Sequence, residues 1–238
     1  MEKIEEYRHI ITKEVKEIFL ESFKSAIEKI DKKKFSFIGV IGSIKKDKSH
    51  DIDVVILPSK NTKLGEAMIE LAKIYELTEQ NIKKHHERYY IVTCPKLAMQ
   101  EMVYYLAGTE EGAAGMIPVH SMFYANYNDL KRLSPKSFIK RMKENLITLH
   151  GSLKEAKSLP QLPQEKLEPY FFLLDFEMSS RIKNFPRHLI RASAESLFDY
   201  LKKKYQMKIN EKIPHNIEEI NKEFIKLLKI LDKQTYST

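Results

Sequence analysis

Apolar residues in the first part of the chain recur first with a helical period and then in strand-like runs. Between residues 3 and 31 they return every three or four positions, which predicts one long amphipathic helix. The run FSFIGVIGS at 35–43 is short and apolar and ends in Gly-Ser, which is typical of a buried strand that leads into a turn. A second buried strand is expected over 52–57, where β-branched residues gather before Pro58.

Helical and strand patterns continue to alternate up to residue 133. We expect helices over 64–83, 97–106 and 128–133, strands over 89–93 and 118–124, and a loop over 108–115. Alternation of this kind is typical of a sheet with helices packed on its faces. The pattern therefore predicts an α/β domain over residues 1–133.

The pattern changes at Ser134-Pro135, which is a helix-start signal because a capping serine precedes a proline in the first helical position. Helical spacing then continues to the end of the chain, and no strand is expected there. The expected helices span 136–149, 165–183, 187–205 and 216–232. Residues 134–238 are therefore predicted to form a separate helical domain.

Composition excludes several classes of protein. The chain has 238 residues, of which 42% are hydrophobic and 31% charged, so a folded core is expected rather than a disordered chain. The single cysteine, Cys94, excludes an intrachain disulfide framework and a Cys-rich zinc site. The first residues are charged and no apolar run reaches transmembrane length, so we expect a cytoplasmic protein without a membrane partner.

The net charge of +8 suggests a polyanionic partner, but its distribution gives no basic arm. Residues 1–150 hold 25 basic and 21 acidic residues and residues 151–238 hold 16 and 12, so each part carries +4. A mixed Lys- and Glu-rich surface is the simpler explanation of this balance. Specific chemistry therefore has to be sought in local motifs.

Two carboxylates stand at the entry to the second predicted strand. Because strand side chains alternate between faces, Asp51 and Asp53 are expected to project together, while Ile52 and Val54 point into the core. Two carboxylates on one face of a buried strand repel each other unless a cation lies between them. Oxygen ligands of this kind suit Mg²⁺ or Mn²⁺ bridged to substrate phosphates.

The turn before these carboxylates has the composition of a phosphate-binding turn. Gly42 allows the backbone to come close to a phosphate, and the N–H groups of the turn and the Ser43 hydroxyl can hold its oxygens. Lys45, Lys46 and Lys48 follow in the loop, where they either neutralise triphosphate charge or are ordinary solvated lysines. His50 likewise either contacts substrate or is a solvated loop residue.

Together these residues carry a family resemblance. The matching positions are Ile41, Gly42, Ser43, Asp51, Ile52 and Asp53. They resemble the signature of the nucleotidyltransferase superfamily that includes DNA polymerase β, poly(A) polymerases, CCA-adding enzymes and the minimal nucleotidyltransferases. The resemblance implies an α+β or α/β fold, with a nucleotidyltransferase-like mixed sheet and flanking helices followed by a helical bundle domain.

The same resemblance implies an activity and its site residues. Asp51 and Asp53 would hold Mg²⁺ or Mn²⁺ and act in catalysis, and Gly42 and Ser43, with Lys45 beside them, would bind the phosphates of ATP or another NTP. The enzyme would transfer a nucleoside monophosphate to a hydroxyl group of RNA, of a protein or of a small molecule.

One part of the family pattern is missing. The family uses a third carboxylate on a later central strand, and no acid lies within the predicted strands 89–93 and 118–124. Glu87 and Asp129, just outside them, are the candidates, and His120 either faces the site or is a structural histidine. The gap leaves open a non-catalytic nucleotide- or RNA-binding protein on the same fold.

The helical half carries a second, shorter resemblance. Arg181 and His188, with six residues between them, resemble the Arg-(four to six residues)-His motif of the HEPN ribonucleases, although Pro186 interrupts the helix that would carry them. That resemblance implies metal-independent RNA cleavage, with His188 as acid or base and Arg181 on the phosphate. A HEPN-type ribonuclease or toxin–antitoxin component is therefore a further alternative.

Overall fold

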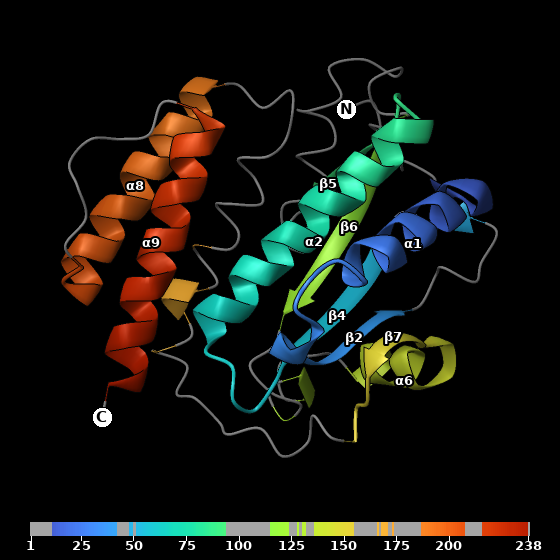
Figure 1. Cartoon of the computed structure of the whole chain (residues 1–238), viewed down its shortest axis with the longest axis horizontal. Coiled ribbons are helices and arrows are strands. Elements are labelled where there is room, and N and C mark those ends of the chain that lie inside the picture. Colours follow the sequence, from blue (N-terminus) through green and yellow to red (C-terminus); the bar gives the residue numbers. More distant parts are fainter. Residues whose placement is uncertain are drawn as a thin grey trace, which may run out of the picture.

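The described part of the chain folds around one sheet. The computed structural model describes residues 11–41, 48–49, 51–93, 115–123, 128, 130–131, 136–154, 166, 168–170, 173, 187–207 and 216–237. Within these residues the fold is α+β, with a five-stranded mixed sheet and helices packed on its faces (Figure 1). The expected class, a mixed sheet with flanking helices, is confirmed at this level.

The central strand of the sheet is β4. In spatial order the strands are β5 (Tyr90–Thr93), β6 (Met116–Phe123), β4 (Ile52–Pro58), β2 (Phe35–Ile41) and β7 (Ile147–Gly151). β4 pairs parallel with β6 and antiparallel with β2, β5 pairs parallel with β6, and β7 pairs antiparallel with β2. Both faces of β4 are covered, which explains why its sequence is a nearly continuous apolar run.

The first helix is shorter than the pattern predicted. Helix α1 spans Lys13–Ile27, and Ile11–Thr12 before it form the short strand β1, so the prediction of a helix over 3–31 was wrong at both ends. Thr12 caps the helix, because its side-chain oxygen accepts a hydrogen bond from the backbone N–H of Val15 at 3.4 Å. The apolar period continues across Thr12 without a break, so periodicity alone could not show where the helix begins.

Both ends of this segment continue into other short elements. Strand β1 pairs antiparallel with β3 (Lys48–Ser49). After α1 the chain turns through the 3-10 helix η1 (Lys32–Lys34) before it enters β2. Residues 3–10, the first part of the predicted helix, lie outside the described part of the chain.

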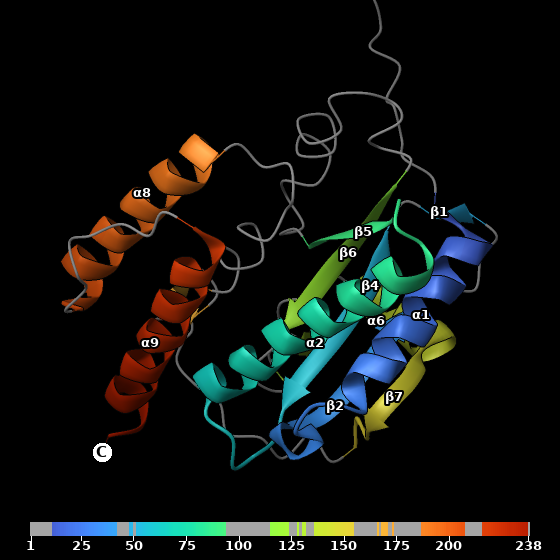
Figure 2. The ribbon, with the colours of Figure 1, turned by 45° about the horizontal axis from the view of Figure 1, so that its top comes forward.

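Helices α1 and α2 (Leu64–His85) cover one face of the sheet, side by side (Figure 2). Ile52 and Val54 of β4 belong to the core beneath them, as expected from strand alternation. Phe23 of α1 is fully buried there, and its ring lies between Phe19 and Tyr75, at centroid distances of 5.2 and 5.8 Å. This apolar layer fixes which side of β4 is left for polar groups.

Helix α6 (Lys136–Asn145) lies against the opposite face. Its buried Met142 belongs to a second apolar cluster with Phe37, Ile41, Val55, Leu57 and Leu130. Asp53 lies two residues before Val55 of this cluster, and strand side chains two residues apart share a face, so Asp53 belongs to this side of the sheet.

The prediction of a helix over 136–149 was wrong in its last part, where strand β7 begins. The helix ends at Asn145, and Ile147–Gly151 form an edge strand on β2, although no strand was expected after Ser134. The open edge of β2 offers a hydrogen-bonding ladder, and β-branched Ile147 and Thr148 suit it better than a further helical turn. The sheet therefore includes a strand from the region assigned to the helical domain.

Of the last two helices, the final one packs against α2, and the other lies on its far side (Figures 1 and 2). Helix α8 spans Arg187–Tyr205, as predicted, and α9 spans Ile217–Tyr236, which is longer than the predicted 216–232. The predicted helix 97–106 lies outside the described residues, as do most residues of the predicted loop 108–115 and of the predicted helix 165–183, and half of those in the predicted helix 128–133. The division into domains 1–133 and 134–238 remains a prediction.

Candidate metal site

Two neighbouring strands bring three metal-ligating side chains together. Asp51 immediately precedes β4, Asp53 lies in it, and His120 of β6 is the register partner of Asp53 in the parallel pair. The Nδ1 atom of His120 lies 3.1 Å from Oδ2 of Asp51 and 3.2 Å from Oδ1 of Asp53. The two carboxylates thus point to the same side, as predicted, and meet at a single nitrogen atom.

The three side chains differ in their exposure to solvent. Asp53 and His120 are buried, with 6% and 8% of their surface exposed, whereas 29% of the Asp51 side chain remains exposed. Asp51 therefore forms the open side of the group. A ligand or an ion entering from solvent would meet this carboxylate before the two buried residues.

The electrostatics of the group centre on the imidazole. Burial of His120 opposes its protonation, but hydrogen bonds to Asp51 and Asp53 and their negative charges outweigh this and raise the pKa of His120 to about 9. In the metal-free group this pKa keeps the imidazole protonated at neutral pH. The imidazolium takes the place that the sequence assigned to a cation between the carboxylates.

The second ring nitrogen of His120 has no such partner. Its Nε2 atom is buried and makes no hydrogen bond within the described part of the chain. A histidine retained only for structural hydrogen bonding is expected to satisfy both ring nitrogens. Of the two roles considered for His120, its position therefore favours the site.

The donor set fits a divalent metal ion. One ligand atom from each of Asp51, Asp53 and His120 can be chosen so that all three lie within 4.8 Å of one another. Carboxylate oxygens and imidazole nitrogens are both common metal ligands in proteins. Among the described residues these three form a possible metal-binding group.

The other predicted site residues lie mainly outside the described part of the chain. This holds for Gly42, Ser43, Lys45, His50 and Asp129, whose assignments remain predictions. The loop that carries most of them runs between the end of β2 and the start of β4, where Ile41 pairs with Asp53.

The remaining candidate for a third carboxylate, Glu87, does not join this group. It is exposed in the turn before β5, and the group contains Asp51, Asp53 and His120 without it. His120 was only one of several candidates in the sequence. No local sequence pattern assigns His120 to the site, because its position there depends on the pairing of β6 with β4.

The Arg181 and His188 pair is not tested by the fold. Arg181 lies outside the described residues, and His188 lies near the start of α8, which begins at Arg187 directly after Pro186. The proline thus stands at the boundary of the helix that carries His188.

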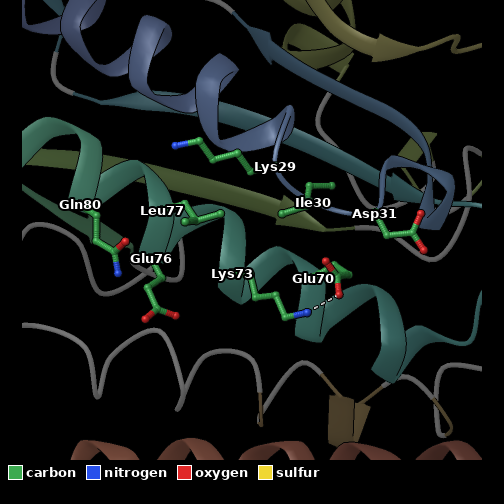
Figure 3. Close-up of a pocket in the computed structure, with 8 residues that line it drawn as sticks. All are labelled: Lys29, Ile30, Asp31, Glu70, Lys73, Glu76, Leu77 and Gln80. Atoms are coloured by element: carbon green, nitrogen blue, oxygen red, sulfur yellow. Dashed lines mark hydrogen bonds and ion pairs between the residues drawn. The ribbon is translucent and has the colours of Figure 1, made fainter.

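A separate pocket of about 400 Å³ lies where the end of α1 approaches α2 (Figure 3). Its lining alternates in charge, with Lys29 and Asp31 opposite Glu70 and Lys73, and the last two form an ion pair at 2.6 Å. It opens on the α1 and α2 face of the sheet, away from the Asp-Asp-His group. This mixture of positive and negative side chains does not favour any particular class of ligand.

No family model, curated protein or solved structure matches this chain. None of the described helices combines the length and the apolar character that crossing a membrane requires.

Proposed function

We propose that this chain is a metal-dependent nucleotidyltransferase, which transfers a nucleoside monophosphate from an NTP to a hydroxyl group. The observation that carries the proposal is the meeting of Asp51 and Asp53 at one nitrogen atom of His120. A strand that presents two acids to one point, directly after a Gly-Ser turn and a basic loop, suits a triphosphate with its counter-ion.

Each residue has a distinct part in this proposal. Asp51 and Asp53 hold the divalent metal, Mg²⁺ or Mn²⁺, and Gly42, Ser43 and Lys45 bind the β- and γ-phosphates. When bound, the metal neutralises charge on the phosphates and stabilises the leaving group. Burial of Asp53 keeps water from competing for its oxygens, while the more exposed Asp51 faces the incoming substrate.

The reaction is an in-line displacement at the α-phosphorus. A bond forms between the acceptor hydroxyl oxygen and the α-phosphorus, and the bond from that phosphorus to the bridging oxygen breaks. Pyrophosphate leaves with the bonding electron pair, and the hydroxyl proton passes to solvent. RNA, a protein and a small molecule are the acceptor classes that the proposal allows.

Label transfer tests this proposal directly. The purified chain is incubated with each α-³²P-labelled NTP, Mg²⁺ or Mn²⁺, and pools of total RNA and protein. We expect the label on one acceptor class and a loss of at least about 100-fold in Asp53→Asn. Asp199→Asn is the matched control, because the Asp199 side chain is 68% exposed on α8.

Two outcomes contradict the proposal. One is that no pool takes up label and no pyrophosphate is released with any NTP. The other is that Asp53→Asn transfers label as fast as the parent chain and Asp199→Asn.

A second candidate function is nucleotide or RNA binding without transfer. The observation that favours it is the residue beside the two acids, where the described part of the chain supplies His120 and no third carboxylate. This candidate predicts saturable NTP binding that needs Asp51 and Asp53. Release of pyrophosphate by the parent chain would rule it out.

A further inference from the structure

We propose that His120 is a ligand of the metal and makes the Asp51–Asp53–His120 group selective for a first-row transition metal, such as Mn²⁺, Co²⁺ or Zn²⁺, over Mg²⁺. The inference rests on the proposed function only in placing a divalent ion on Asp51 and Asp53. It adds a third protein ligand and the class of metal.

The first argument is the geometry around one atom. Both carboxylates approach Nδ1 of His120, at 3.1 and 3.2 Å. Nδ1 carries at most one hydrogen, which it cannot donate with good geometry to two acceptors at once. Adjacent ligands on an octahedral ion with bonds of about 2.1 Å lie about 3.0 Å apart, which is close to both separations.

The second argument is the chemistry of the donors. Mg²⁺ prefers oxygen ligands in an octahedral shell and keeps several of its waters. Imidazole suits Zn²⁺, Fe²⁺, Ni²⁺ and Cu²⁺, and Mn²⁺ accepts oxygen ligands readily. A group of two carboxylates and one imidazole therefore favours an ion that binds both kinds of donor, which excludes Mg²⁺ as the preferred ion.

The third argument is the burial of the imidazole. His120 is only 8% exposed, yet its Nε2 makes no hydrogen bond within the described part of the chain. Burying a polar ring beside two acids is costly unless its nitrogens are used. Ligation through Nδ1 would use the ring nitrogen that faces both acids.

Calorimetry on the metal-free chain, without nucleotide, tests the inference. The chelator-treated full chain is titrated separately with MnCl₂, CoCl₂, ZnCl₂ and MgCl₂. We expect each transition metal to bind at least about 10-fold more tightly than Mg²⁺. The preference for Co²⁺ and Zn²⁺ over Mg²⁺ should fall by about 10- to 100-fold in His120→Asp, because an oxygen ligand replaces the nitrogen.

The matched control is His85→Asn, because His85 is an exposed residue in the last turn of α2. This variant should keep the metal preference of the parent. Circular dichroism reports whether His120→Asp is folded. If it is not, the parent chain itself still tests the inference, because pulsed electron paramagnetic resonance of bound Mn²⁺ detects coupling to a directly ligated ¹⁴N.

Three results would overturn the inference: binding of Mg²⁺ as tightly as of the transition metals, an unchanged preference in folded His120→Asp, or Mn²⁺ without ¹⁴N coupling. Failure of the proposed function looks different. The metal preference would then hold while no NTP yields pyrophosphate. Label transfer by a chain that prefers Mg²⁺ would instead support the function and overturn this inference.

Discussion

Asp232 of α9 caps the start of α2, because its Oδ1 atom accepts a hydrogen bond from the backbone N–H of Gly65 at 2.9 Å. The residue before the helix, Lys63, supplies no side-chain cap of its own. Tyr236 also caps this end of α2, because its hydroxyl oxygen accepts a hydrogen bond from the backbone N–H of Leu64 at 3.3 Å. A helix at the end of the chain thus satisfies backbone donors of a helix in the α/β core.

Removal of this cap should destabilise the fold. In Asp232→Ala the buried N–H of Gly65 loses its acceptor, and the hydroxyl of Tyr170, which donates to the same oxygen at 2.9 Å, keeps only its contact with Thr235 at 3.2 Å. We expect a loss of about 1–3 kcal/mol in the free energy of unfolding, measured with urea. Asp232→Asn keeps an acceptor oxygen and should cost less, because burial already raises the pKa of Asp232 and disfavours its charge. An equal loss in both variants would contradict this account.

A glycine fixes the edge strand β7. Gly151 has a φ angle of +68°, and a Cβ atom there would lie 1.9 Å from the carbonyl oxygen of Ser36. Gly151→Ala should therefore lower the free energy of unfolding by at least about 1 kcal/mol. Thr148→Ala is the control, because Thr148 is exposed on the same strand. Equal stability of the two variants would show that β7 tolerates a side chain at this point.

The stability of the metal-free chain should depend on the charge of His120. Its pKa of about 9 in the folded chain exceeds the ordinary value of 6.5, so the folded state binds more protons between these values. The contribution is fully present below pH 6.5 and is lost as pH rises through about 9, with a total of at most about 3 kcal/mol. Urea unfolding with a chelator present, at several pH values, measures it.

The control for this pH dependence is His120→Asn, which has no proton to lose. Its free energy of unfolding should vary less over the same pH range than that of the parent. A parent chain whose stability stays constant or rises from pH 6.5 to 9 would exclude a raised pKa.

Metal binding should also stabilise the fold. An ion that binds only the folded chain adds about 2.7 kcal/mol at a concentration 100 times its Kd. For a chain of this size we expect the Tm to rise by about 5–10 °C with Mn²⁺. The rise should disappear in Asp51→Asn and be reversed by a chelator, whereas Asp199→Asn should behave like the parent. A rise that persists in Asp51→Asn would place the ion elsewhere.

Local pattern was sufficient for much of the fold and for two of the three residues of the possible metal-binding group. Strands β2 and β4 are apolar runs, α2 and α8 are strongly periodic, and each was predicted within a few residues. The shared direction of Asp51 and Asp53 follows from strand alternation alone. These features depend only on residues that are close in the sequence.

The features that the sequence did not reveal depend on pairing between distant segments. His120 reaches the two acids because β6 pairs with β4 in one register, which no local pattern specifies. Strand β7 forms because the edge of β2 is available to it, although its sequence also continues a helical spacing. In α1 the apolar period continues across Thr12, and only the cap sets where the helix begins.

The contact between Asp53 and His120 joins positions 67 residues apart in the chain. Closing a loop of this length costs entropy that the finished sheet offsets, so we expect the contact to form late in folding. A partly folded chain without β6 would have the two acids but not the imidazole beside them. On the proposed ligation, metal affinity would be a measure of completed strand pairing, and a newly made chain would gain it only once β6 has taken its place beside β4.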